Sequence, residues 1–126
     1  MKALNARRIN IRIGDSWVSP ILHVLLTRED DVVVARCLDF TVSSHGKDEK
    51  DASKSLADTI KEYILTSIED SNIDNLFDPA HNKYWRMFNE LEAKQLHKKF
   101  KRSMSKSILK ESSKKLKKLT VEVTYA

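Results

Sequence analysis

The stretch of residues 21–64 constrains the fold more than any other part of this chain. It contains an apolar run, an acidic turn, an apolar run rich in β-branched residues, a third short run and a one-sided helix. Short apolar runs bounded by turn residues are typical of buried strands. The order predicts an α+β fold, in which a small, mostly antiparallel sheet with β-β-β-α order is covered by one helix.

The strands are expected at three places within this stretch. Residues 21–26 and 32–37 are close enough to pair as a hairpin across the acidic turn 28–31. A third strand is expected at about residues 40–44. Before them, residues 10–13 alternate polar and apolar side chains, which predicts one further short strand.

The helix that follows is the clearest element of the sequence. Asp48 is a suitable N-cap, and Glu49 and Asp51 lie in the first turn, where the helix dipole favours carboxylates. One face is apolar at helical spacing and holds Ala52, Leu56, Ile60, Tyr63, Ile64 and Ile68. Such a helix is suited to cover one face of a sheet.

A second helix is expected to begin at Asp78-Pro79, with Asp78 as N-cap and proline at the first helical position. Its early apolar residues share one face, and its later ones, from Leu96 and Phe100 on, share a different face. Either the helix breaks near residues 92–94 or it passes between two partners. We favour a helix that leaves the sheet and packs on another surface, such as a second subunit.

The last residues predict one more strand. From Leu119 to Tyr125, apolar side chains alternate with Thr120, Glu122 and Thr124. We expect this strand to rejoin the sheet within a single domain, 1–126, made of a core at about 10–70, a helical and basic extension at 78–118 and the strand 119–125. A homodimer is expected, because a small sheet leaves an edge and a face to cover.

The single cysteine and the shortness of the apolar runs indicate the cellular compartment. Cys37 is the single cysteine, which is typical of a reducing compartment, and no apolar run is long enough to span a membrane. We therefore expect a cytoplasmic protein. The net charge of +5 is unevenly distributed, with segment nets of +1 for 1–46, −5 for 47–93 and +9 for 94–126.

Several short motifs in the core resemble the HicB-like antitoxin family. They are residues 35–39 (Ala-Arg-Cys-Leu-Asp), residues 43–46 (Ser-Ser-His-Gly) and the helix start at 48–52 (Asp-Glu-Lys-Asp-Ala). Gly46 matches the glycine of that family and Ala52 its small helix residue. The match covers residues 21–65 or so, and it departs from the family pattern at Lys47-Asp48 and at 38–41, where the family's proline-rich segment is absent.

The resemblance implies a fold and a role. The family has a small three-stranded sheet with one helix across it, and it binds and blocks a small basic ribonuclease toxin, HicA. Many members add a C-terminal DNA-binding module, but this sequence contains neither a ribbon-helix-helix nor a helix-turn-helix pattern. The expected role is that of an antitoxin-type or orphan regulatory protein that acts by protein–protein contact and is not an enzyme.

Two sets of residues are candidates for contact with partners. The first set consists of loop and aromatic positions, which are Asp39, His45, Tyr84, Trp85 and Phe88. For Tyr84, Trp85 and Phe88, burial in a core or dimer interface is the alternative to base stacking, since aromatic residues at helical spacing usually bury themselves.

The second set is basic. Residues 94–118 contain eleven basic residues and one acidic residue, a density that can neutralise several phosphates. The candidate nucleic-acid contacts are Lys98, Lys99, Lys101, Arg102, Lys106, Lys110, Lys114 and Lys115. This segment makes a nucleic-acid-binding protein the first alternative function. Complementation of an acidic protein surface is the other interpretation.

A metal-dependent nuclease or hydrolase on the same fold is the second alternative. It would need carboxylates that converge from neighbouring strands, and Asp39 is the only carboxylate in the strand region after the acidic turn. The four histidines show no zinc-site spacing. We therefore expect no metal, no cofactor and no catalytic residue.

Overall fold

The computed structural model describes residues 1–125, and the chain forms two compact units. The first unit spans Met1–Glu92 and the second begins at Ala93. Each unit is described by itself. The elements in chain order are β1 (Lys2–Ile9), β2 (Arg12–Ile13), β3 (Trp17–Val18), β4 (Leu22–Glu29), β5 (Val32–Cys37), β6 (Val42–Gly46), α1 (Glu49–Glu69), a 3-10 turn η1 (Ile73–Asn75), α2 (Asn82–Lys106) and α3 (Ser113–Leu116).

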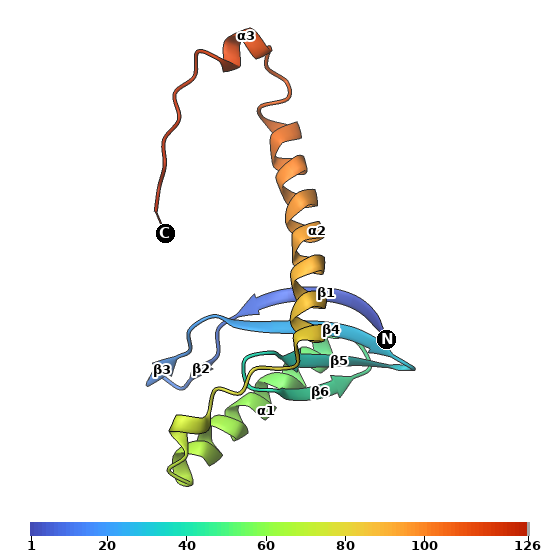
Figure 1. Ribbon diagram of the computed structural model, residues 1–126, viewed down its shortest axis with the longest axis vertical. Helices are drawn as coiled ribbons and strands as arrows, with labels where there is room; N and C mark the ends of the chain where they lie inside the picture. Colours follow the sequence, from blue (N-terminus) through green and yellow to red (C-terminus); the bar gives the residue numbers. More distant parts are fainter. Residues whose placement is uncertain (126) are drawn as a thin grey trace. The chain divides into compact units, whose positions relative to one another are not determined.

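The α+β prediction is confirmed. Four antiparallel strands form one sheet in the order β1-β4-β5-β6, and β4 and β5 form the expected hairpin, with Val24 opposite Cys37 (Figure 1). Strand β1 was not predicted. Its pairing with β4 is interrupted by a register shift between Ala3 and Asn5, so its apolar residues do not alternate regularly along the sequence.

A small hairpin of β2 and β3 follows β1. The sequence predicted a strand at 10–13, and the structure confines it to β2, which pairs with β3. Gly14 in the turn has a φ of +55°, a backbone region that side chains disfavour and glycine tolerates.

Helix α1 covers one face of the sheet, as predicted (Figure 1). Asp48 is its N-cap, and the Asp51 backbone N–H donates to Asp48 Oδ1 at 2.7 Å. Ala52, Leu56 and Ile60 are buried against the strands. A side chain at Gly46 would approach the Ala52 nitrogen to 2.5 Å, so glycine is what allows the end of β6 to lie this close to α1.

The opposite face of the sheet is covered by the first turns of α2. Phe88 is fully buried there beside Leu25 and Leu38. The sequence predicted one covering helix, and the structure adds this second layer within the first unit. Interior packing of the Phe88 side chain fits the core interpretation of the aromatic cluster.

The start of α2 differs from the prediction. Asp78 and Ala80 donate their backbone N–H groups to the carbonyls of Asp39 and Leu38, at 3.0 and 2.8 Å, so this segment runs extended beside a turn. The helix begins only at Asn82. His81 caps it, because the Lys83 N–H donates to His81 Nδ1 at 3.0 Å.

The second unit contains the rest of α2, which is continuous through residues 92–94, and the short α3. The predicted strand at 119–125 is wrong, because these residues form no strand and Val121, Val123 and Tyr125 are exposed. An alternating pattern forms a strand only where a neighbouring strand supplies hydrogen bonds. The described residues show no such partner for this segment.

Candidate binding surfaces

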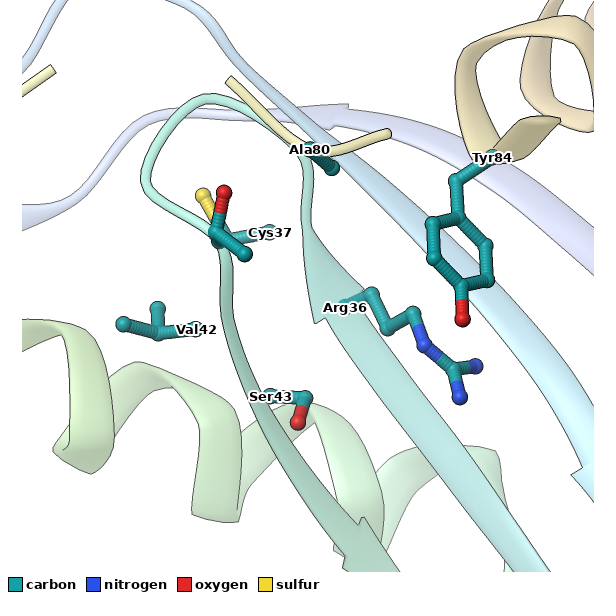
Figure 2. A pocket seen from close by; sticks show the side chains of 7 residues that line it. Arg36, Cys37, Val42, Ser43, Ala80 and Tyr84 are labelled. Carbon is teal, nitrogen blue, oxygen red and sulfur yellow. The ribbon is translucent and has the colours of Figure 1, made fainter. Parts of the chain in front are cut away.

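A polar cleft lies between the β5–β6 edge and the start of α2. It has a volume of about 280 Å³ and is lined by Arg36, Cys37, Thr41, Val42, Ser43, Ala80 and Tyr84 (Figure 2). The Arg36 guanidinium lies 4.7 Å from the centre of the Tyr84 ring. The same guanidinium donates to Thr27 Oγ1 at 2.9 Å and pairs with Glu29 Oε2 at 2.9 Å. Its charge is therefore already compensated, which weakens the cleft as an anion site.

Asp39 is buried in the interior of the first unit. Its carboxylate accepts the backbone N–H of His23 at 2.7 Å and lies 3.1 Å from His23 Nδ1. Only 4% of the residue is exposed. Asp39 thus fixes the turn after β5 to the start of β4, and it offers no surface to a partner in this structure.

Two of the three aromatic candidates, Trp85 and Phe88, form one cluster with His23. The His23 ring lies 5.1 Å from the Trp85 ring and 5.4 Å from that of Phe88, centre to centre. Phe88 is fully buried and is closed to a partner or a base, while Tyr84 and Trp85 are half-buried. His45 is exposed, and it lies on the edge strand β6 opposite Val34 rather than in a loop.

Cys37 is fully buried, and this burial raises the pKa of its thiol to about 11. A thiol with this pKa is protonated at neutral pH and is a poor nucleophile. Its packing in the core under α1 explains why a small apolar side chain such as cysteine occupies this position.

A larger apolar groove lies at the end of α1, and sequence reasoning missed it. Two adjoining cavities of about 390 and 200 Å³ share Trp17 and Leu76. We call their combined surface the apolar groove, and its other lining residues are Ile13, Ser16, Ser19, Pro20, Ile21, Leu22, Phe40, Ile64, Leu65, Ile68, Ile73 and Phe77. Phe77 is 63% exposed and Ile68 54%. Large apolar side chains gathered at one surface mark interaction sites in soluble proteins.

Exposed carboxylates adjoin the lining residues of the apolar groove in the sequence. Within two sequence positions of those residues lie six exposed acidic residues and one basic residue, Arg12, and exposed Lys61 lies one helical turn before Ile64 and Leu65. We call the six the acidic rim, and they are Asp15, Glu62, Glu69, Asp70, Asp74 and Asp78. The sequence gives one indication of the acidic rim, because residues 62–78 contain five acidic and no basic residues.

Two of these carboxylates stand where the helix itself disfavours them. Glu69 is the last residue of α1 and Asp70 is its C-cap, and no basic residue occupies the last turn. The carboxyl end of a helix dipole is negative and stabilises cations instead. A cationic ligand at the apolar groove would relieve this local repulsion.

The second unit carries the basic candidates, all eight of which are exposed. We call residues 94–118 the basic segment. Leu96 and Phe100 lie one helical turn apart on it and are 54% and 69% exposed. An ion pair within the segment joins Lys115 Nζ to Glu111 Oε2 at 3.0 Å. The basic segment is thus a cationic surface with an exposed apolar stripe.

Residues 1–125 contain neither a metal-binding group of side chains nor a helix that could cross a membrane. They contain no group of three or more His, Cys, Asp or Glu side chains placed to hold a metal ion. No helix among them is long and apolar enough to cross a membrane.

Comparison of the chain with protein-family models, with curated proteins and with solved structures finds no match. The assignment of a function therefore depends on the surfaces described above.

Proposed function

We propose that this chain is a HicB-like protein of the cytoplasm, an antitoxin-type or orphan regulator that binds another protein and has no catalytic activity of its own. The apolar groove with its acidic rim carries the proposal. Its exposed apolar area is suited to a protein surface, and its carboxylates favour a basic one. A small basic toxin, which the family resemblance implies, has the matching chemistry.

The local structure at the resembling residues supports the HicB-like part of the proposal. Along the chain, β4, β5 and β6 are followed by α1, as in the family pattern of three strands and a helix. Gly46 and Ala52 make the close approach between strand and helix for which a glycine and a small residue are needed. These contacts bear on the fold, whereas the groove bears on the role.

The test is coexpression with a small basic protein encoded in a neighbouring reading frame. We expect a complex that isothermal titration calorimetry can measure, and neutralisation of any ribonuclease activity of that protein. The variant Ile68→Glu places a charge in the apolar groove and should weaken the complex at least about tenfold. Val32→Glu is the control, because Val32 is also an exposed apolar residue and lies outside the groove. Equal affinity of the two variants would contradict the proposal.

Nucleic-acid binding through the basic segment is a second candidate, favoured by its exposed cations. Such binding should weaken steeply as salt rises, because each neutralised phosphate releases counterions. Titration of labelled DNA and RNA at two salt concentrations measures it. Absence of binding at low salt would remove this candidate.

A further inference from the structure

We propose that the basic segment of one copy of this chain docks in the apolar groove of a second copy, and that two reciprocal contacts of this kind close a homodimer. The inference rests on the proposed binding function of the groove and names an occupant for it. The two surfaces are complementary in both apolarity and charge.

The apolar part of the contact is a helix in a groove. Leu96 and Phe100 lie one turn apart on α2 and are largely exposed. The groove offers apolar side chains from α1 and from the β2–β3 hairpin, including Ile68 and Trp17. Amphipathic helices are commonly recognised in this way, through anchors one turn apart.

The charged part of the contact selects this occupant. Exposed Lys98, Lys99, Lys101 and Arg102 are sequence neighbours of Leu96 and Phe100, and the acidic rim adjoins the lining residues of the groove in the sequence. Opposite charges at the margin of an apolar interface steer association and disfavour wrong partners. A cationic helix would also relieve the repulsion of Glu69 and Asp70 at the carboxyl end of α1.

The groove and the basic segment are different surfaces of one chain, so repeated contact between them either closes or extends into a filament. In the closed form, two copies each supply one groove and one segment, and the two equivalent contacts give a two-fold dimer. A segment bound in this way is not free for nucleic acid, so dimer formation and nucleic-acid binding should compete.

The experiment is sedimentation velocity on the full chain over a range of concentrations. We expect a monomer–dimer equilibrium that weakens as salt rises, since exposed charges are screened. Phe100→Glu and Ile68→Glu should each raise the dissociation constant at least about tenfold. A monomer at every concentration, or a dimer that neither substitution affects, overturns the inference.

Charge reversal sharpens the test. One variant reverses the rim (Glu69→Lys, Asp70→Lys and Asp74→Lys), and the other reverses the segment (Lys98→Glu, Lys99→Glu and Arg102→Glu). Each alone should be a monomer, because rim and segment then carry the same sign. A mixture of the two variants restores both complementary contacts, so it should form a heterodimer. Failure of the mixture to associate overturns the inference.

A matched control separates the effect of charge at the acidic rim on dimer formation from the effect of the net charge of the chain. Asp31→Lys, Asp58→Lys and Glu90→Lys together reverse three exposed carboxylates outside the acidic rim. This variant should keep the wild-type dimer, and its loss would show that net charge alone governs association. The rim-reversed variant should melt no lower than wild type, because lysine at position 69 suits the helix terminus.

The inference and the proposed function fail separately. A monomeric chain that binds a basic partner at the apolar groove removes this inference and leaves the proposed function. A dimer formed through the groove by a chain that binds no other protein leaves the inference and removes the toxin-directed role.

Discussion

The two faces of the four-stranded sheet are built differently. The face under α1 has an apolar core, with Val24, Val33 and Leu56 among its buried residues, and a hydrogen bond between the Ser44 and Ser55 hydroxyls joins β6 to α1. The face under α2 combines a small apolar cluster around Phe88 with polar contacts. Those contacts join Asp39 to His23 and Arg36 to Glu29. Burial of apolar side chains therefore accounts for most of the first face, whereas the second depends more on a few partnered polar groups.

The substitution that should reduce stability most tests whether α2 belongs to the folded core of the first unit. Phe88→Ala removes a fully buried ring and should lower the free energy of unfolding by about 3–5 kcal/mol. Chemical denaturation followed by circular dichroism measures it. A loss below about 1 kcal/mol would show that the second layer contributes little.

The matching change on the other face is Leu56→Ala. Leu56 is buried between α1 and the strands, so its truncation should cost about 3 kcal/mol. Denaturation under the same conditions gives the comparison. A loss below about 1 kcal/mol for Leu56→Ala would contradict apolar burial as the basis of the α1 face.

The sequence predicted the α1 face because its signals are local. Asp48 marks the helix start, and the spacing of Leu56 and Ile60 identifies the buried side without knowledge of the sheet. The α2 face has no such signal, since Tyr84 and Phe88 at helical spacing favour burial but do not say whether it is in a core or in a dimer interface. The apolar groove is harder still to predict from the sequence. Trp17, Ile68 and Phe77 are distant in sequence, and only the tertiary fold brings them together.

A smaller effect is expected from the buried carboxylate of the α2 face. Asp39→Asn removes the charge that strengthens the hydrogen bonds to His23 and should cost about 1.5 kcal/mol. Hydrogen exchange at the His23 amide provides a local readout, because this N–H donates to Asp39. Unchanged exchange protection and unchanged stability would show that the contact is dispensable.

The smallest effect concerns the margin of the same face. Arg8 donates to Glu92 at 2.8 Å, and this hydrogen bond lowers the pKa of Glu92 below its ordinary value of 4.5. Because the folded-state pKa is depressed, the pair stabilises the protein above pH 4.5 and is lost as the pH falls through the lower value. Melting temperatures of wild type and Glu92→Gln should differ slightly at neutral pH and converge in acid. A difference that persists in acid would contradict this origin.

In the proposed dimer, the apolar groove is a binding surface that a second copy occupies. Trp17 lines the groove and is 40% exposed, so its fluorescence reports occupancy directly. In a Trp85→Phe background Trp17 is the remaining tryptophan. We predict that its emission shifts to shorter wavelength as protein concentration rises, and that Phe100→Glu abolishes the shift. An emission maximum independent of concentration, or a shift that survives in Phe100→Glu, would contradict the account.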